Sequence, residues 1–342
     1  MGYKYLAKQD IKELFDKVSK IGDVFAPVKK GVEVVWSEVQ DVSKVLFDFK
    51  NTSLSPKGLF FPQTECMFEF KNNPRAEDGF ILKEVPPLEK NRVILNIRPC
   101  DARAFSILDK VFMRDEDSLD VYWKDKRDKT TLIGLACNNP ASTCFCTQVG
   151  SSPFGEQGLD VLMIDLGDKY LLKPITDKGK DILDGFNDAS DEDVKKIDEL
   201  KQNAENKIKT RLSMDNILSR EILEVYENPY WDRLHETCLN CGACTFYCPT
   251  CHCFDIQDET KGEYGRRVRN WDTCMSWLFT QHASGHNPRG TKKHRVRQRF
   301  MHKFKYMPIK LDGDIGCVGC GRCILVCPVN IDVRDVVNNL NK

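Results

Sequence analysis

The chain has 342 residues, 16 cysteines, and 51 basic side chains that balance 51 acidic ones. This length suggests two domains rather than one, and the balanced charge excludes steering of the whole protein toward nucleic acid. No apolar run approaches the roughly 20 residues of a membrane span, and the N-terminal residues lack the apolar core of a signal peptide. We therefore expect a cytoplasmic protein without a membrane span, in which reduced cysteines bind metal.

The first part of the chain has the pattern of an α/β domain. Apolar residues at helical spacing predict an amphipathic helix over 11–21. Apolar runs predict strands over 92–97 and 131–136. The runs 160–166 and 169–172 flank Gly-Asp and predict a hairpin with a two-residue turn.

Cysteine content marks a domain boundary before about residue 230. Eleven of the 16 cysteines lie within 238–327. We predict the α+β fold class, with an α/β domain over 1–180, a helical connector over 181–230 and an α-helical ferredoxin domain over 231–342.

The C-terminal part carries the motif C-x2-C-x2-C-x3-C-P twice. Three cysteines of such a motif hold one [4Fe–4S] cluster, and the fourth, placed before proline, reaches the other cluster in two-cluster ferredoxins. Zinc is the alternative, but zinc takes cysteine pairs at longer separations. The spacing therefore predicts two [4Fe–4S] clusters, the first held by Cys238, Cys241, Cys244 and Cys327 and the second by Cys317, Cys320, Cys323 and Cys248.

The 68 residues between the two motifs are basic and partly helical in pattern. Helical spacing is present over 277–281 and 292–304, and of the charged residues between Arg266 and Lys310 only Asp272 is acidic. The basic charge has three interpretations: a docking face for an acidic redox partner, compensation of anionic clusters and their thiolates, or a solvated helix face. No nucleic-acid-binding module accompanies it.

A third group of cysteines follows the two predicted strands. Cys100 and Cys137 each come after an apolar strand, and Cys144 and Cys146 follow through a short loop. If the strands are parallel neighbours, both thiols emerge at the carboxyl edge of the sheet, where α/β proteins place their sites. We therefore expect a third [4Fe–4S] cluster on these four cysteines, with buried cysteines that bind no metal as the alternative.

The remaining cysteines fit no cluster motif. Cys251, Cys253 and Cys274 are interpreted as structural thiols beside a cluster, with an accessory metal or redox role as the alternative. Cys66 is interpreted as a small core residue. In the segment after the first strand, Asp101 is the predicted N-cap of a helix.

Segments throughout the chain resemble the iron–sulfur β subunit of sulfhydrogenase-type complexes and its relative, the iron–sulfur subunit of anaerobic sulfite reductase. The likeness runs from near residue 20 to the end, and its segments are 55–65, 98–101, 137–146, 248–251, 271–274, 285–289 and 317–323. The resemblance implies an electron-transfer subunit of an anaerobic multi-subunit oxidoreductase. Such a subunit relays electrons between two partners: a flavin-containing NAD(P)H reductase subunit, and a terminal catalytic subunit of the hydrogenase, sulfite reductase or heterodisulfide-reductase type.

The residues themselves agree with a non-catalytic role. The sequence has no G-x-G-x-x-G after a strand, no Walker loop and no recognisable nucleophile–base arrangement. Two rival hypotheses stay open: a redox-sensing or scaffold protein whose clusters are structural, and a subunit that itself binds substrate at an incomplete cluster within 100–146.

Overall fold

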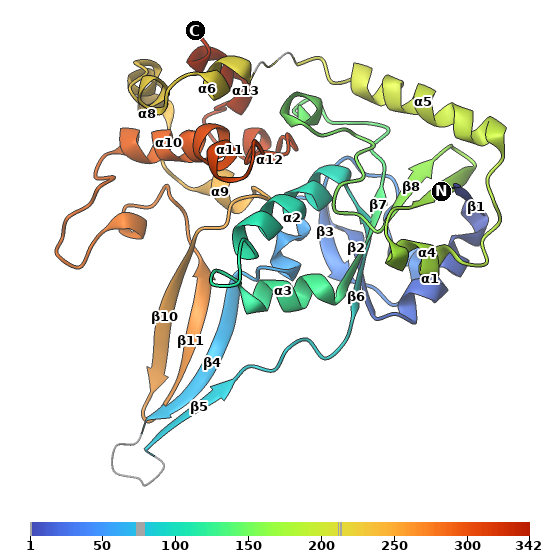
Figure 1. Cartoon of the computed structure of the whole chain (residues 1–342), viewed down its shortest axis with the longest axis horizontal. Coiled ribbons are helices and arrows are strands. Elements are labelled where there is room, and N and C mark those ends of the chain that lie inside the picture. The colour runs from blue at the N-terminus through green and yellow to red at the C-terminus, as the bar shows by residue number, and fades with distance from the viewer. Residues whose placement is uncertain (1, 73–78, 211, 213) are drawn as a thin grey trace.

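The computed structural model describes residues 2–72, 79–210, 212 and 214–342. It contains a mixed seven-stranded sheet, an antiparallel four-stranded sheet and a helical part (Figure 1). In the described part of the chain, no helix is long and apolar enough to cross a membrane.

The large sheet has the strand order β1-β9-β8-β7-β6-β2-β3. Strands β2, β6, β7 and β8 are parallel to their neighbours in this series, whereas β3, β9 and β1 add antiparallel edges. The predicted strands and the predicted hairpin are confirmed. The strands are β1 Lys4–Ala7, β2 Asp23–Lys30, β3 Glu33–Glu38, β6 Arg92–Ile97, β7 Thr130–Leu135, β8 Val161–Asp165 and β9 Lys169–Pro174.

Both faces of the large sheet are buried, which explains why its central strands are continuously apolar. Val93 and Leu95 of β6 contribute to one core, together with helices α1 (Ile11–Ser19) and α4 (Asp177–Leu183). Ile94 and Ile97 contribute to the opposite core, together with α2 (Pro99–Phe112), α3 (Val121–Asp128) and α5 (Asp191–Asn206). The predicted helix over 11–21 is therefore present as α1.

The C-terminal helices pack around a separate apolar cluster. Trp231, Val296, Phe300 and Val337 are among its buried members. The elements of this part are α6 Asp215–Ser219, α7 Ile222–Tyr226, α8 Tyr230–Thr237, α9 Ala243–Phe246, α10 Lys292–Met301, the π-helical turn His302–Tyr306, α11 Met307–Lys310, α12 Arg322–Leu325 and α13 Val333–Leu340.

A hairpin in the insert between the two motifs was not expected from the sequence. Strands β10 (Phe254–Lys261) and β11 (Tyr264–Trp271) pair with β4 (Thr64–Asn72) and β5 (Phe80–Glu84) in the order β10-β11-β4-β5. This sheet projects away from the body of the molecule (Figure 1). Of the expected helices in the insert, 292–304 is present as α10 and the turn after it, whereas 277–281 is reduced to the single 3-10 turn Leu278–Thr280.

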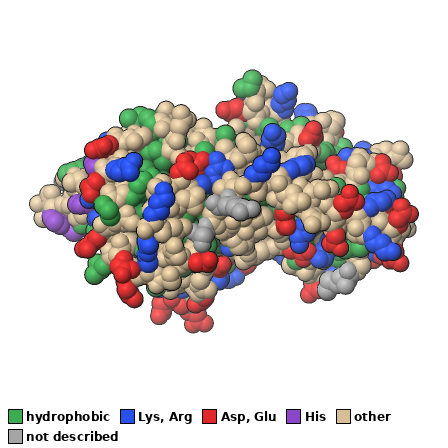
Figure 2. Space-filling view, turned by 90° about the horizontal axis from the view of Figure 1, so that it is seen from above, with side chains coloured by type: hydrophobic (Ala, Val, Ile, Leu, Met, Phe, Trp, Pro, Cys, Tyr) green, Lys and Arg blue, Asp and Glu red, His purple; other side chains and the backbone are tan. Residues whose placement is uncertain are grey.

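Much of the positive charge of the basic stretch 266–310 is paired or buried, which favours charge compensation over a docking face formed by the whole stretch. Arg266 and Arg267 on β11 pair with Glu259 and Asp258 on β10, each at 2.7 Å. Five other basic side chains of the stretch are buried: Arg269, Arg297, Arg299, Lys303 and Lys305. On the face seen in Figure 2, basic and acidic side chains are interspersed.

Asp101 does not cap α2, which corrects the expectation from the sequence. The N-cap position is Arg98, and Pro99 takes the first helical position. The Asp101 carboxylate is 1% exposed and accepts two hydrogen bonds from the Arg322 guanidinium, at 2.6 and 2.8 Å. This bidentate pair joins the N-terminal α/β part to the second cysteine motif.

The second cysteine motif packs directly on the loop that carries Cys144 and Cys146. The amide of Phe145 donates to the carbonyl of Gly319 at 2.9 Å. Gly319 has φ +65°, and a Cβ on it would lie 2.5 Å from the Cys146 nitrogen. Only glycine can therefore occupy this position without moving the loop.

We predict that Gly319→Ala lowers the melting temperature of the protein much more than Gly313→Ala. Both positions have positive φ, but a Cβ added to Gly313 would meet no atom within 4 Å. Both substitutions carry the roughly 1–2 kcal/mol strain of a left-handed residue, and Gly319→Ala adds overpacking of about 1–3 kcal/mol. Thermal unfolding of anaerobically purified protein measures the difference. Equal melting temperatures for the two variants would contradict the close packing of motif and loop.

Candidate metal centre

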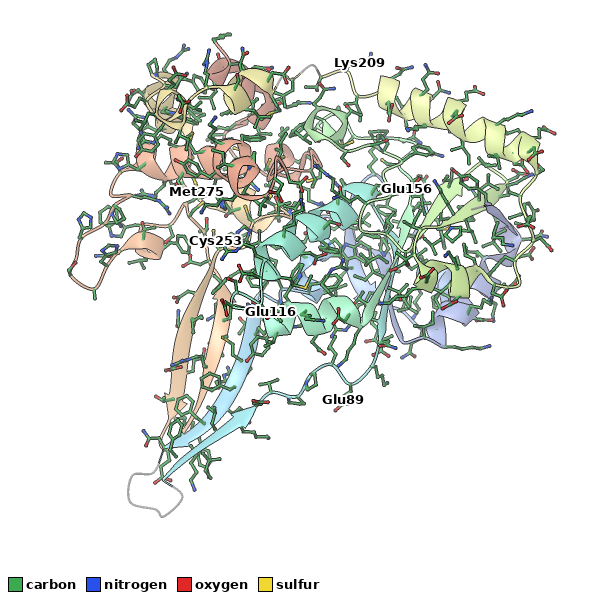
Figure 3. The ribbon with its side chains drawn as sticks, viewed as in Figure 1. Glu89, Glu116, Glu156, Lys209, Cys253 and Met275 are labelled. Atoms are coloured by element: carbon green, nitrogen blue, oxygen red, sulfur yellow. The ribbon has the colours of Figure 1, made fainter. Side chains whose placement is uncertain are left out.

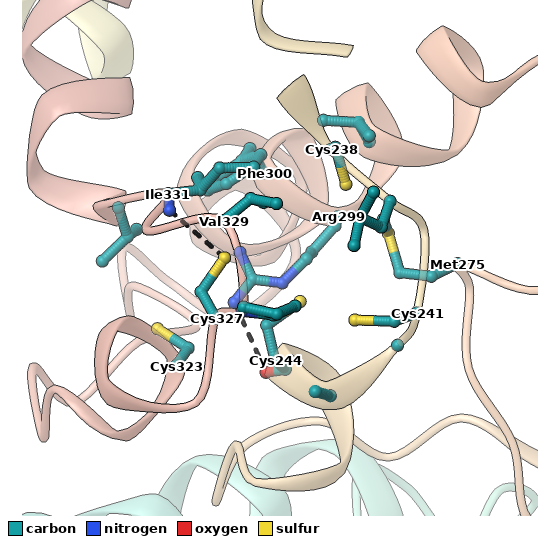
Figure 4. A pocket seen from close by; sticks show the side chains of 16 residues that line it. Cys238, Cys241, Cys244, Met275, Arg299, Phe300, Cys323, Cys327, Val329 and Ile331 are labelled. Carbon is teal, nitrogen blue, oxygen red and sulfur yellow. Dashed lines mark hydrogen bonds between the residues drawn. The ribbon is translucent and has the colours of Figure 1, made fainter. Parts of the chain in front are cut away.

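The first cysteine motif surrounds a pocket together with the last cysteine of the second motif. The thiols of this pocket come from the loop between α8 and α9, from α9, from α12 and from the turn after α12, and they are Cys238, Cys241, Cys244, Cys323 and Cys327 (Figure 4). The rest of the wall is largely apolar, with Met275, Val296, Phe300 and Ile331 among its residues.

The second motif lines a smaller pocket. Cys317, Cys320 and Cys323 line it, and the fourth thiol is Cys248, the last cysteine of the first motif. The structure thus exchanges the fourth cysteines between the motifs, as the C-P spacing predicts. The assignment of these eight thiols as iron ligands itself stays a prediction.

The backbones of the two motifs match. The third residue of each motif, Asn240 or Gly319, has positive φ, and its amide faces the sulfur of the first cysteine at 3.4 and 3.5 Å. Gly242 and Gly321 then start α9 and α12 with φ of +76° and +75°. The amides of Asn240 and Gly319 are thus placed to donate hydrogen bonds to thiolate sulfur. Such hydrogen bonds are one of the determinants of the reduction potential of an iron–sulfur cluster.

A further amide reaches the exchanged cysteine. The Ile331 nitrogen lies 3.2 Å from Cys327 Sγ, and Figure 4 draws this contact. Asn330, with φ +55°, makes the turn that aims the amide at the sulfur.

Arg299 lies between the two pockets and lines both. Its side chain is 4% exposed, and its Nη2 donates to the Cys244 carbonyl at 3.4 Å, as Figure 4 shows. Burial lowers the pKa of Arg299, but the neighbouring thiols of Cys244 and Cys323 outweigh burial and shift it well upward. The Nε of Arg299 is buried and has no partner among the described residues. The guanidinium is therefore placed to face anionic sulfur from both sides.

Two buried lysines add to this positive charge. Lys303 Nζ donates to Thr250 Oγ1 at 2.8 Å and to the Gly316 carbonyl at 2.9 Å. Lys57 Nζ donates to the Cys251 carbonyl at 2.7 Å and lies 3.9 Å from the centre of the Trp271 ring. Burial lowers the pKa of Lys57, and the charges of Cys251 and Cys248 oppose this shift.

These cations fit an anionic cluster. Within the described ranges, no carboxylate forms an ion pair with Arg299, Lys303 or Lys57. Buried cations need a counter-charge, and four thiolates around an iron–sulfur core supply one. In the same part of the chain, no three His, Cys, Asp or Glu side chains converge as closely as a single metal ion requires.

The strand ends that lead to Cys100 and Cys137 lie side by side at the carboxyl edge of the sheet. Strands β6 and β7 are parallel neighbours, as the hypothesis required. Arg98 reaches from the end of β6 to the carbonyls of Leu135 and Ala136, at 3.2 and 3.0 Å, and so fixes the two strand ends that lead to Cys100 and Cys137.

The thiols of the third group influence one another. Burial raises the pKa of Cys144 to about 12, and the charges of Cys137 and Cys320 add to the shift. Burial likewise raises the pKa of Cys146 to about 12, with Cys144 and Cys137 as the next causes. Cys144 Sγ lies 3.7 Å from the Cys320 carbonyl oxygen, so this group borders the second motif.

The last four cysteines differ from the sequence interpretation in part. Cys251 hydrogen bonds to Cys248 through their sulfurs, and Cys253 does so to Cys274. Sequence reasoning missed both pairs. The Cys253–Cys274 pair depends on the β10–β11 hairpin, which the sequence did not predict. The interpretation of Cys66 as a core residue is wrong, because Cys66 lies partly exposed on β4 of the projecting sheet.

Comparisons with known proteins point to the same chemistry. A family model described as a 4Fe-4S dicluster domain matches residues 237–331. Sulfhydrogenase 2 subunit beta from Pyrococcus furiosus is 29% identical over 349 aligned residues, which cover 100% of this chain and 99% of the relative. No solved structure matches the chain. The chain is thus similar over its whole length to a sulfhydrogenase subunit beta, and residues 237–331 match a 4Fe-4S dicluster domain.

Proposed function

We propose that the chain is the electron-transfer subunit of an anaerobic multi-subunit oxidoreductase. The observation that carries the proposal is the pair of adjoining pockets, each lined by the first three cysteines of one motif and the last cysteine of the other. Cys323 and Arg299 line both pockets. A [4Fe–4S] cluster bound in each pocket would supply a reversible one-electron carrier. Cys238, Cys241, Cys244 and Cys327 hold the first cluster, and Cys317, Cys320, Cys323 and Cys248 hold the second.

A third [4Fe–4S] cluster on Cys100, Cys137, Cys144 and Cys146 extends the path that electrons take through the two C-terminal clusters. Cys323 lines both C-terminal pockets, and Cys144 borders the Cys320 carbonyl. The second motif therefore stands in the middle of the proposed order, with the first motif on one side and the third group on the other. In this proposal the α/β domain over 1–180 carries the third cluster, the segment 181–230 is the connector, and the α-helical ferredoxin domain over 231–342 carries the other two.

The first pocket is the proposed point of exchange with another subunit. Cys241 is exposed, and Leu239 and Leu325 nearby in the two motifs are 62% and 66% exposed. A cluster with a purely structural role gains nothing from a ligand at the surface, so this exposure favours electron transfer over the scaffold hypothesis. The relative is named as a subunit of a sulfhydrogenase. One proposed partner is a flavin-containing NAD(P)H reductase subunit, and the other is a terminal catalytic subunit of the hydrogenase, sulfite reductase or heterodisulfide-reductase type.

Iron and acid-labile sulfide measurements test the number of clusters. We expect roughly twelve irons per chain after anaerobic expression, and about four fewer in Cys144→Ser, because each cubane holds four irons. Cys66→Ser is the matched control and should lose none, since Cys66 lies on the projecting sheet. About eight irons in the unaltered protein would contradict the third cluster, and fewer than about four would contradict the proposal as a whole.

Removal of the Arg299 charge tests the electrostatic role of that side chain. We expect Arg299→Gln to lower the midpoint potentials of both C-terminal clusters by something on the order of 60 mV, a tenfold change in the equilibrium constant of a one-electron couple. The positive charge favours the more negative, reduced state, and Arg299→Lys should restore most of the potential. An anaerobic redox titration followed by electron paramagnetic resonance measures these values.

Arg297→Gln is the control for this titration. Arg297 is also buried on α10, but its guanidinium stacks on the Tyr226 ring and donates to the Tyr226 carbonyl, at 3.4 and 3.2 Å. It lines neither pocket. Potentials that fall equally in the Arg297→Gln and Arg299→Gln variants would indicate a general loss of packing instead of a specific charge effect.

A further inference from the structure

Cys253 and Cys274 meet at the open end of the β10–β11 hairpin. Phe254 pairs with Trp271 at the start of the hairpin, and the Asp272 amide donates to the Cys253 carbonyl at 3.0 Å. This register places the two cysteines just beyond the paired strands, where their sulfurs hydrogen bond to each other. Cys253 lies where the hairpin joins the helical part of the molecule (Figure 3).

The pair differs from the twelve cysteines of the three predicted cluster sets. The thiols of the first two sets line pockets, as ligands of a bulky cluster must. The thiols of Cys253 and Cys274 instead face each other at the end of the hairpin, and a disulfide needs two cysteines that face each other in this way. Cys274 is 7% exposed and Cys253 is half-buried.

The location of the pair connects it to both C-terminal cluster sets. Cys274 is within electrostatic reach of Cys244, a predicted ligand of the first cluster. Cys253 is within electrostatic reach of Cys251, whose sulfur hydrogen bonds to Cys248, a predicted ligand of the second cluster. The hydrogen bond with Cys274 and the positive charge of Lys303 lower the pKa of Cys253 to about 7, against the effect of burial, whereas the hydrogen bond with Cys253 and burial raise the pKa of Cys274. Cys253 is therefore the thiolate of the pair. Thiolate is the form that takes part in disulfide chemistry.

We propose that Cys253 and Cys274 form a redox-active dithiol/disulfide site that exchanges two electrons with the neighbouring clusters. The inference rests on the proposed function, because the clusters are its one-electron partners. Reduction breaks the sulfur–sulfur bond, takes one electron from each of two reduced clusters and two protons from water, and leaves two thiols. Oxidation reverses each of these transfers: the bond forms, two protons are released, and each of two oxidised clusters gains one electron. The site would let a path of one-electron carriers store a two-electron equivalent.

The test uses the full chain, purified anaerobically with its iron and poised at a series of potentials with redox mediators. Samples are quenched in acid, alkylated with N-ethylmaleimide under denaturing conditions and digested for peptide mapping. We expect a Cys253–Cys274 cross-linked peptide at the higher potentials and complete alkylation of both cysteines after treatment with dithionite. A reductive titration should take up two electrons more per chain in the unaltered protein than in Cys253→Ser or Cys274→Ser, because a disulfide is a two-electron couple.

Iron content separates the outcomes. Cys253→Ser and Cys274→Ser should keep the iron of the unaltered protein, and Cys66→Ser should keep both the iron and the two additional electrons. Iron-loaded protein that never yields the cross-linked peptide would overturn the dithiol site and leave the proposed function intact. A loss of about four irons in Cys253→Ser would also overturn it, because the cysteine would then be a cluster ligand. Unaltered protein without iron would overturn the proposed function, and the inference with it.

Discussion

Compensation of buried positive charge is the constraint on which the rest of this structure depends. Arg299, Lys303 and Arg322 are 4%, 3% and 2% exposed, and a cation removed from water costs several kcal/mol unless an opposite charge lies beside it. Arg322 has the carboxylate of Asp101. Arg299 and Lys303, by contrast, have carbonyl, hydroxyl and sulfur atoms as their described neighbours. The helical part therefore reaches electrostatic balance only when its sulfurs are anionic, and cluster-bound thiolates are anionic at every pH at which the cluster persists.

The same arrangement explains how two regions distant in sequence become one electron path. The second motif contacts the first through the exchanged Cys248 and Cys327, and it contacts the α/β part through Gly319 and Arg322. Two residues make the contact with the α/β part possible. Gly319 lies where a Cβ would clash, and the Arg322 guanidinium donates two hydrogen bonds to one carboxylate. The packing of the α/β part on the second motif also keeps their thiols close together. If this interface loosened, the third group of cysteines would separate from the second motif.

Features set by short stretches of sequence could be predicted. The central strands are apolar on both faces, the β8–β9 turn has glycine at its left-handed position, and the ligand spacing of each motif lies within one loop. Features that depend on a distant partner were missed. Asp101 has the composition of an N-cap, but its carboxylate is taken by Arg322, 221 residues away. The basic stretch likewise suggested a surface, because a sequence does not tell that Glu65 and Asp120 meet Arg269 or that Arg299 and Lys303 are buried.

The β10–β11 hairpin shows most clearly why part of the site could not be foreseen. Its outer strand β10 is exposed along nearly its whole length, so neither face carries an apolar alternation that would distinguish it from a polar helix or loop. The strand is held instead by ladder hydrogen bonds to β11 and by the cross-strand pairs of Asp258 with Arg267 and Glu259 with Arg266. Its register alone brings Cys253 to Cys274. Cysteine spacing reveals a site when the ligands share a loop, but a pair assembled by strand register becomes visible only when the partner of each strand is known.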